Sequence, residues 1–417
     1  MRVLIIGSGA REHALAWKFS ISKRICGLYI APGNAGTDEL GENLPDLDIN
    51  DHEQVIQICK VHKIEAVFIG PEAPLAAGLA DQLETAGIPT IGPKQESAKL
   101  EASKAFSKKF MKKHRIPTAE SKEFSDPKKF EKYVSNTDSR IVVKKSGLAA
   151  GKGVLESDNI DEIISFGKDV LKDDTLIVEE FLEGFEVSIF ALCDGKNYIV
   201  LPPCSDFKKA HEGDTGPNTG GMGSICPVPW VSSSLLEEIE STIVEPTFKG
   251  LKKEGLLYKG VVYIGLMITP DGPKVLEYNV RFGDPESQVL LPVIKSDFGN
   301  LTDAIINEKL DTFPLELQDY SSIGVVVASE GYPGEYEKGK AVAPMPSFPE
   351  RDAVIFHAST TRDENGTVKT RGGRCFTAVG FGKNLLSASI RAYEAASKIQ
   401  FDGAWYRNDI GKKFFME

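Results

Sequence analysis

Short apolar runs alternate with amphipathic segments over the first hundred residues of the chain. Each run of β-branched and aliphatic residues precedes a segment with the 3.6-residue period of a surface helix. The expected strands are Val3–Ile6, Leu28–Ala31, Asp46–Ile49, Ala66–Ile69 and Thr90–Ile91. The expected helices between them are 11–20, 52–62 and 75–86. Asn50 and Glu53 predict a capping box on the second helix. The alternation predicts a parallel, doubly wound sheet.

The regular alternation ends near residue 94. A helical pattern over 94–116 is closed by Pro117. The expected elements that follow are a buried strand at Ile141–Val143, a helix near 160–172, and a strand from Leu176 that runs into an acidic turn. Residues 205–223 contain five glycines and no apolar period, so we expect a long functional loop there.

Two strands around Pro270-Asp271-Gly272 predict a hairpin, and a different pattern begins near residue 300. The expected elements of these regions are Val261–Thr269, Lys274–Val280, a helical link over 301–308, strands at Ile323–Ala328, Val354–Ser359 and Cys375–Val379, and a helix at Leu385–Ile399. We therefore expect a small α+β domain over 321–417, joined by a linker at 301–320.

Length and charge narrow the class of protein. A chain of 417 residues is too long for a single core, so two to four domains are expected. The net charge of −11 argues against a nucleic-acid partner. No stretch has the length and apolarity of a membrane span or a signal peptide. The six cysteines form no CxxC pair and the six histidines are dispersed, which favours reduced thiols in a cytoplasm and no zinc site.

A strand, a glycine-rich loop and a second strand are predicted between Ile141 and Leu155. Gly147, Gly151 and Gly153 would let backbone N–H groups approach an anion, and Lys144 adds positive charge. The spacing differs from a Walker A loop, because only three residues separate the first two glycines and no Ser or Thr follows the lysine at 152. The segment is either a flap over nucleotide phosphates or a plain glycine hairpin.

Three turns are expected at the carboxyl ends of the first strands, where ligands bind in an open α/β sheet. They lie at 7–12, 32–37 and 70–75. The first resembles a dinucleotide fingerprint, but Glu12 replaces the third glycine and the second strand ends in Ala31-Pro32 without an acid for a ribose. The three turns together favour a binding site for something other than NAD.

Oxygen ligands and charges follow the predicted hairpin. Glu277 and Asn279 are two apart on a strand and so share a face, which suits Mg²⁺ beside phosphates. Arg281 and Asp284 come directly after them. Polar residues of the long glycine-rich stretch that could line the same site are Asp206, Lys208, Asp214, Asn218 and Thr219.

These features, in this order, resemble the ATP-grasp superfamily: a lysine before a glycine-rich flap, the hinge E-E-F-L at 179–182, then E-x-N. The blocks G-x-G-x-R-E-H, P-G-N-A-G-T, G-P-E-A-P-L, G-L-A-A-G-K-G-V, D-T-G-P-N-T-G-G-M-G and R-F-G-D-P-E resemble the phosphoribosylamine–glycine ligase (glycinamide ribonucleotide synthetase) family over 1 to about 411. The resemblance implies a preATP-grasp domain over 1–102, an ATP-grasp domain over 103–300 and a closing cap over 321–417.

The resemblance further implies ATP-dependent ligation of glycine to 5-phosphoribosylamine through a glycyl phosphate, with Mg²⁺ or Mn²⁺, as a step of purine biosynthesis. By analogy, catalysis would fall to Lys144, Arg281 and Asp284, and metal binding to Glu277 and Asn279. ATP would be bound by Lys104, Lys144, Gly147, Gly151, Gly153, Glu179, Glu180, Phe181, Leu182 and Glu186. The substrates would be held by Gly9, Asn34, Glu72, Asp214, Asn218, Thr219 and Arg374. For Arg374, a structural turn arginine is an equal alternative.

Three residues at two sites depart from the family pattern, and three other functions remain open. Lys145-Ser146 replaces Ala-Asp, and Phe207 replaces a histidine. The alternatives are an ATP-grasp ligase with another carboxylate or amine, a non-catalytic nucleotide-binding protein, and a dehydrogenase. Retained metal ligands disfavour the second and Glu12 disfavours the third. We expect a cytoplasmic monomer that acts on ATP, glycine and 5-phosphoribosylamine, with no nucleic-acid or membrane partner.

Overall fold

The computed structural model describes residues 1–137, 139–148, 153–349 and 351–415. The first part of the chain forms a five-stranded sheet of order β3-β2-β1-β4-β5, in which all neighbours run parallel. This confirms the doubly wound prediction. The elements are β1 (Arg2–Gly7), α1 (Ala10–Ser20), β2 (Gly27–Pro32), η1 (Thr37–Glu39), β3 (Glu42–Asn43), α2 (His52–His62), β4 (Ala66–Ile69), α3 (Glu72–Ala76), α4 (Leu79–Thr85) and β5 (Thr90–Ile91).

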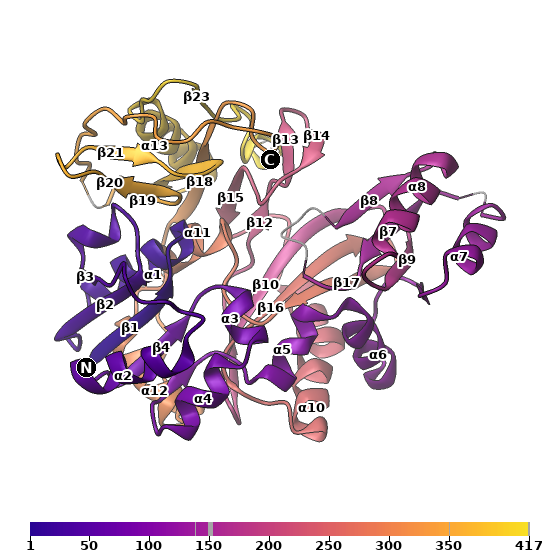
Figure 1. The fold of residues 1–417 in the computed structure, drawn as a ribbon, viewed down its shortest axis with the longest axis horizontal. Helices are drawn as coiled ribbons and strands as arrows, with labels where there is room; N and C mark the ends of the chain where they lie inside the picture. The colour runs from indigo at the N-terminus through magenta and orange to yellow at the C-terminus, as the bar shows by residue number, and fades with distance from the viewer. Residues whose placement is uncertain (138, 149–152, 350, 416–417) are drawn as a thin grey trace.

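The central part contains two four-stranded antiparallel sheets, and one of them projects as a separate lobe in Figure 1. The lobe has the order β6-β9-β7-β8 and the second sheet the order β11-β10-β16-β17. The lobe and the helices before it comprise α5 (Gln95–Ala102), α6 (Lys104–His114), β6 (Ser121–Phe124), α7 (Pro127–Val134), β7 (Ile141–Lys145), β8 (Val154–Ser157), α8 (Ile160–Val170) and β9 (Leu176–Glu180).

The second central sheet packs against helices from later in the chain. Tyr198 stacks on Phe248 of a covering helix, with ring centroids 4.2 Å apart. The elements are β10 (Phe185–Asp194), β11 (Tyr198–Val200), α9 (Ser233–Ile239), the π-helical turn η2 (Glu240–Val244), α10 (Glu245–Glu254), β16 (Lys259–Thr269), β17 (Gly272–Asn279), α11 (Glu286–Val293), α12 (Phe298–Ile306) and η3 (Leu310–Thr312).

The last part of the chain shares a sheet with strands from the glycine-rich stretch. Its order is β12-β15-β18-β22-β19, with β23 also paired to β18, and α13 packs on β22. The elements are β12 (Ser205–Asp206), β13 (Lys209–His211), β14 (Thr215–Asn218), β15 (Gly223–Cys226), β18 (Ser321–Ser329), β19 (Ala353–His357), β20 (Thr360–Arg362), β21 (Val368–Thr370), β22 (Arg374–Gly382), α13 (Leu385–Ser397), β23 (Ala404–Trp405) and η4 (Lys412–Phe414).

Three sequence-based predictions of local structure were wrong, and one hairpin was missed. Residues 205–223 contain β12 and the hairpin β13–β14 rather than a loop. Residues 46–49 form turns, because Pro45 cannot donate to a ladder and Asp48 accepts from the N–H of Asn50. Asp51 caps α2 instead of Asn50, and accepts from the N–H of Gln54 at 3.0 Å. The hairpin β20–β21, which lies between β19 and β22, had no predicted counterpart.

Two helices that were predicted as continuous are each divided. Gly78, at φ +86°, separates α3 from α4. Ser103 is extended, at φ −139°, and its side chain caps α6 by accepting from the N–H of Phe106. The break at Ser103 places Lys104 at the first position of α6.

A buried histidine pair joins the first sheet domain to the last one. Nδ1 of His13, on α1, accepts from the N–H of His357, on β19, at 2.8 Å. Burial lowers the pKa of His357 to about 4 and the pKa of His13 well below its usual value. Unfolded histidine takes up a proton near pH 6.5, so the stability from keeping these rings neutral is present above that pH. It is lost as the pH falls towards 4.

We expect His357 alone to contribute roughly 3 kcal/mol to the loss of unfolding free energy between pH 6.5 and 4. Urea unfolding across this range should therefore give a shallower pH dependence in His357→Gln than in the wild type. His52→Gln, at the start of α2, is the matched control and should keep the wild-type slope. Equal slopes for the wild type and His357→Gln would contradict the assignment.

Candidate functional site

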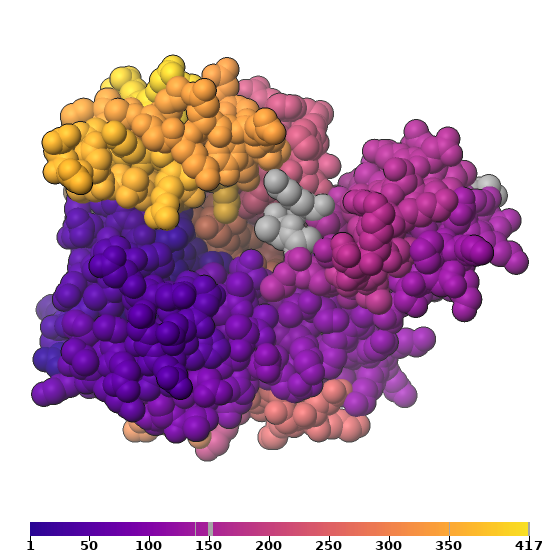
Figure 2. Space-filling model, in the orientation of Figure 1, coloured from indigo at the N-terminus to yellow at the C-terminus, as the bar shows by residue number. Residues whose placement is uncertain are grey.

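A cleft of about 840 Å³ is lined by residues from the first sheet domain, the lobe, the central sheet and the last domain. The space-filling view shows the surface hollowed between the lobe, the first sheet domain and the last domain (Figure 2). Predicted site residues that line the cleft are Glu72, Lys104, Lys144, Gly153, Glu179, Glu180, Phe181, Leu182, Glu186, Asp214, Asn218, Thr219, Glu277, Asn279, Arg281, Asp284 and Arg374.

Three lysines gather in the cleft around one buried carboxylate. Glu179 lies 2.9 Å from Nζ of Lys144 and 3.1 Å from Nζ of Lys108. Lys104 lies one turn from Lys108 on α6, so both face the cleft. Burial lowers the pKa values of Lys104 and Lys108. Glu179 pairs with two of these ammonium groups, and Lys104 has no ion-pair partner among the described residues, which leaves positive charge for an anion such as a polyphosphate.

The α6 N-terminus is tied to the strand that carries Lys144. The backbone N–H of Lys104 donates to the carbonyl of Ser146 at 2.9 Å, and the N–H of Ala105 donates to Oγ of Ser146 at 3.2 Å. Ser146 is one of the two departures from the family pattern. Here it fixes the spacing of the two cleft lysines.

Glu277 projects from β17 toward the cleft lysines. Burial would raise its pKa, but the charges of Lys208, Lys144 and Lys104 hold the pKa below its usual value. The strand partner of Glu277 is Gly265, where an added Cβ would lie 3.3 Å from Cγ of Glu277. Glu277 is therefore an ionised carboxylate in a tightly packed position.

Asn279 and Glu277 offer two oxygens on the same side of β17. Oδ1 of Asn279 accepts from Nη2 of Arg281 at 3.1 Å, which leaves its second lone pair free. No cluster of three or more His, Cys, Asp or Glu suited to a metal occurs within the described ranges. A pair of oxygen ligands that is completed by substrate phosphates is the usual arrangement for Mg²⁺, so these residues fit such an ion.

Arg281 is held by two acids that come from the first domain and α5. Nη2 lies 2.7 Å from Oε1 of Glu101, and Nε lies 3.9 Å from Oε2 of Glu72. Burial opposes the charge of Arg281, but these carboxylates raise its pKa. Glu101 also accepts from the N–H of Val280 at 2.9 Å. Glu101 thus orients the guanidinium and the strand end together.

Asp284 and Arg374 join the R-F-G-D-P-E segment to the glycines that follow β14. Nη2 of Arg374 lies 3.3 Å from Oδ1 of Asp284, and its Nη1 donates to the carbonyl of Gly220 at 2.5 Å. Burial would raise the pKa of Asp284, but Arg374 and Arg11 keep it below the usual value. Arg374 therefore lines the cleft and also fixes its wall.

Three carboxyl groups, those of Glu186, Asp206 and Glu286, lie around Lys208. The Lys208 ammonium lies 2.5 Å from Oε2 of Glu186. Burial raises the pKa of Asp206 to about 8 despite the attraction of Lys208, and burial also raises the pKa of Glu286. Glu286 is held by the hydroxyl of Ser188 at 3.1 Å. One carboxyl of this group can hold a proton near neutral pH.

The carboxylate of Asp214 is engaged by the C-terminal segment. It lies 3.0 Å from Nη2 of Arg407 and 3.2 Å from Nζ of Lys413. Phe207, the second departure from the family pattern, lies under both cations, at 5.5 and 4.9 Å from its ring centre. This contact anchors the β13–β14 hairpin to the end of the chain.

The first turn is closed by the glutamate that replaces the third fingerprint glycine. Oε2 of Glu12 accepts from the N–H of Gly9 at 2.6 Å, and Oε1 lies 2.5 Å from Nε of Arg11. A Cβ added at Gly7 or Gly70 would lie 2.6 or 2.0 Å from atoms of the Glu12 side chain. The carboxylate thus fills the space over the turn, which explains why the fingerprint is not that of a dinucleotide site.

Three predicted site residues do not line the cleft, and one is outside the described ranges. Gly9 lies beside Asp284, since an added Cβ would be 3.5 Å from Oδ2 of Asp284. Asn34 is buried, donates to the carbonyls of Ser8 and His357 at 2.9 and 3.0 Å, and so holds its own turn. Gly147 donates to Asp174. Gly151 falls in 149–152, outside the described residues.

Three cleft residues were missed at the sequence level. Lys108 could have been found, because it lies four positions after Lys104 in a helical pattern. Arg11 lies in the first turn and lines the cleft, but its spacing alone carried no signal. Glu101 contacts Arg281 across 180 residues of chain, and no local pattern marks such a pair.

Family comparison divides the chain into three matched ranges. Residues 1–101 match the phosphoribosylglycinamide synthetase N domain, residues 102–287 match the ATP-grasp (A) domain of the same family, and residues 322–413 match its C domain. Among the described residues, no helix has the length and apolar character needed to cross a membrane.

Individual relatives agree over almost the whole chain. A phosphoribosylamine–glycine ligase of Rhodopirellula baltica is 44% identical, with 99% of this chain and 97% of that protein covered. The chicken trifunctional purine biosynthetic protein adenosine-3 is also 44% identical over 98% of this chain, which spans only 42% of its length. The crystal structure of phosphoribosylamine–glycine ligase from Thermotoga maritima matches with a TM-score of 0.83 at 35% identity, covering 98% of this chain and 100% of that one.

Proposed function

This chain belongs to the phosphoribosylglycinamide synthetase family of ATP-grasp ligases, and from that premise we propose that its cleft joins glycine to 5-phosphoribosylamine at the expense of ATP. The products are glycinamide ribonucleotide, ADP and phosphate, in a step of purine biosynthesis. The observation that carries the proposal is the group of three lysines facing an ionised Glu277 in one cleft.

The proposed reaction has two steps. A glycine carboxylate oxygen attacks the γ-phosphorus of ATP, the bond to the β-phosphate oxygen breaks, and glycyl phosphate and ADP form. The amine of phosphoribosylamine then attacks the acyl carbon and loses a proton, and phosphate leaves with the former carboxylate oxygen. Such chemistry depends on positioning and charge neutralisation more than on a general base. Lys104 and Lys144 would bind ATP phosphates, and Arg281 would bind the transferring phosphoryl group.

Several residues would position the substrates around that centre. We propose that the hinge over 179–182 meets adenine and that Glu186 meets the ribose once Lys208 releases it. Asp284, Asn218, Thr219 and Arg374 would hold glycine or the amine, and Glu72 and the first turns would hold the phosphosugar. Asp214 and Asn34 would hold neighbouring segments of the site in place rather than contact a substrate, because their polar atoms already have protein partners.

Transfer of a labelled oxygen tests this route. With glycine labelled by ¹⁸O in its carboxylate, ³¹P NMR should show one ¹⁸O in the phosphate released for each turnover. Unlabelled phosphate, together with formation of glycinamide ribonucleotide, would mean that the carboxylate is not phosphorylated, and the glycyl phosphate step would then be wrong. The comparison reaction contains unlabelled glycine in ¹⁸O water, and its phosphate should carry no label.

A divalent cation is expected with ATP in this family, and we propose Mg²⁺, with Mn²⁺ as a substitute. Glu277 and Asn279 would hold it together with phosphate oxygens. The ion would supply neutralisation of phosphate charge. Glu277 is prepared for this by its lowered pKa, and the guanidinium of Arg281 fixes the orientation of the Asn279 amide.

Glu277→Gln should raise the Mg²⁺ concentration for half-maximal activity by roughly 10- to 100-fold. The amide keeps the size of the side chain but removes the charge that attracts the cation. The measurement is a magnesium titration of the ligation rate at saturating ATP. The control is Glu183→Gln, an exposed residue of the loop before β10, which should titrate as the wild type. An unchanged midpoint in Glu277→Gln would remove Glu277 from the metal site.

Domain limits and state of assembly are part of the same proposal. We propose the boundaries 1–102, 103–300, 301–320 and 321–417, with β12 and β15 of the second domain completing the sheet of the last. The chain would act as a cytoplasmic monomer on ATP, glycine and 5-phosphoribosylamine. Sedimentation at micromolar concentration tests the monomer, and a stable dimer would contradict it.

A further inference from the structure

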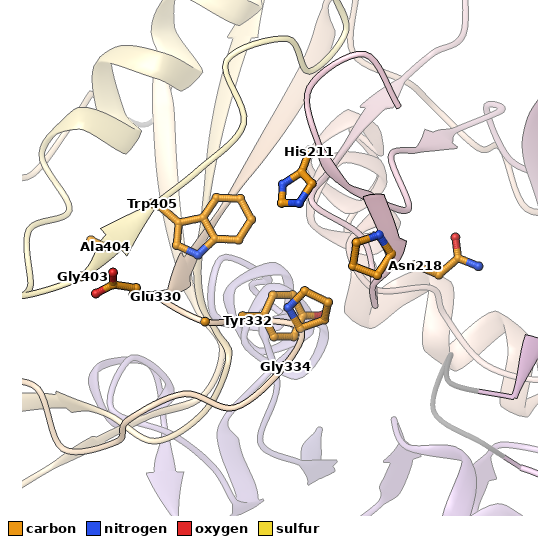
Figure 3. A pocket seen from close by; sticks show the side chains of 11 residues that line it. His211, Asn218, Glu330, Tyr332, Gly334, Gly403, Ala404 and Trp405 are labelled. Carbon is orange, nitrogen blue, oxygen red and sulfur yellow. The ribbon is translucent and has the colours of Figure 1, made fainter. Parts of the chain in front are cut away.

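Lys208 lines the cleft, but the ligation described above gives it no role beyond its contact with Glu186. It lies between β12 and the hairpin β13–β14, which borders both the cleft and a second cavity of about 940 Å³. Figure 3 shows that cavity between Trp405 of the last domain and His211 and Asn218 of the hairpin. Lys208 does not line the second cavity, so its ammonium meets ligands of the cleft alone.

The ion pair of Lys208 with Glu186 lies where it can be exchanged for other contacts. Nζ of Lys208 lies 2.5 Å from Oε2 of Glu186, and the two side chains are 33% and 38% exposed. The backbone of Lys208 is fixed, because its carbonyl accepts from both the N–H and the hydroxyl of Thr219, at 2.7 and 2.8 Å. The ammonium is thus carried by a flexible four-carbon side chain on an anchored backbone, and it can change partners without a movement of the chain.

The charges around Lys208 indicate where a displaced ammonium would turn. No carboxylate of the described chain other than Glu186 lies within ion-pair distance of it. Burial would raise the pKa of Glu277, and Lys208 is the foremost of the cations that hold it below its usual value. Burial raises the pKa of Glu286, and both Lys208 and Arg281 oppose that rise. The ammonium therefore faces the part of the cleft that holds Glu277 and Arg281, where an added anion would offset the loss of Glu186.

We propose that Lys208 exchanges Glu186 for the carboxylate of glycine when the ribose of ATP binds. This inference rests on the proposed function, in which the ribose meets Glu186. The 2′- and 3′-hydroxyls would donate to the two oxygens of Glu186 in place of the ammonium, and the freed ammonium would pair with the glycine carboxylate. ATP and glycine would then each strengthen the binding of the other, because a coupling between two ligands is reciprocal.

Adenosine is the probe for this exchange, because it carries the ribose hydroxyls but no phosphate that could itself act on glycine. In calorimetric titrations of the full chain, saturating glycine should tighten adenosine binding by roughly 5- to 100-fold. The comparison ligand is 2′,3′-dideoxyadenosine, which keeps the adenine ring and lacks both hydroxyls. Its affinity should be the same with and without glycine.

Two variants should lose this coupling in opposite ways. In Glu186→Gln the ammonium has no carboxylate to leave, so glycine alone should bind at least about fivefold more tightly than in the wild type, and adenosine should add nothing. In Lys208→Met glycine should bind weakly with and without adenosine. Lys196→Met is the matched control, because Lys196 forms an ion pair with Glu308 at 2.6 Å outside the cleft, and it should keep the wild-type coupling.

The exchange is overturned by the absence of saturable adenosine binding, by the absence of coupling in the wild type, by equal coupling with dideoxyadenosine, or by wild-type coupling in Glu186→Gln or Lys208→Met. Its failure is distinguishable from failure of the proposed function. A wild type that ligates glycine but shows no coupling contradicts the exchange alone. A wild type that couples glycine to adenosine but does not ligate it supports the exchange and contradicts the ligase.

Discussion

Replacing Lys144 with methionine is expected to lower kcat of the ligation by roughly 10²- to 10³-fold. The ammonium lies in the cleft beside Glu179 at 2.9 Å, and methionine keeps the apolar stem but removes the charge. In the proposed reaction this charge meets the phosphates while negative charge moves between them. Lys108 continues to neutralise Glu179, so the variant should fold.

Lys145→Met is the matched control for this experiment. Lys145 is the next residue of β7, so its side chain points to the opposite face of the sheet, and it does not line the cleft. Its kcat should stay within about twofold of the wild type, because surface substitutions away from a site have small effects. Retention of wild-type turnover in Lys144→Met, or an equal loss in both variants, would contradict the role given to Lys144.

The largest effect on stability is expected from Glu101→Gln. Removal of one partner from a buried ion pair costs roughly 3 to 5 kcal/mol. Glu101 contacts both Arg281, at 2.7 Å, and the N–H of Val280, at 2.9 Å. An amide has a single acceptor oxygen, so one of these two donors would face an NH₂ group. Because Arg281 then loses its fixed position, kcat should also fall by roughly tenfold or more, with a small change in KM for ATP.

Denaturant unfolding and steady-state kinetics of Glu101→Gln test both effects together. The matched control is Glu96→Gln on the same helix, where the carboxylate lies 2.6 Å from Lys99 in solvent. That variant should change the free energy of unfolding by less than about 0.5 kcal/mol. If Glu101→Gln loses stability but keeps kcat, then Glu101 supports the fold without positioning Arg281.

The sequence was sufficient for features that depend on local period and short spacing. The parallel sheet, the strand pair around the flap and the hairpin that carries Glu277 and Asn279 all follow from alternation and turn residues, and the structure confirms them. The two-residue spacing of Glu277 and Asn279 fixes their common face without knowledge of the fold.

Features set by distant contacts could not be predicted in the same way. Residues 205–223 have the composition of a loop, yet β15, which begins at Gly223, pairs with β18, roughly a hundred residues later, and β12 in turn pairs with β15. From its local sequence Asp214 is a candidate substrate ligand, but in the folded chain its carboxylate pairs with Arg407 and Lys413 of the C-terminal segment. In each case tertiary pairing determines the role of a segment whose local pattern favours another.

The most direct test of the central claim is ADP release in the presence of ATP, Mg²⁺, glycine and phosphoribosylamine made in situ, with each component omitted in turn. The account predicts that release requires glycine and the amine together and equals the glycinamide ribonucleotide formed. ADP release that continues without glycine or without the amine, or no release with all components present, would contradict the assignment of the cleft as a glycine ligase.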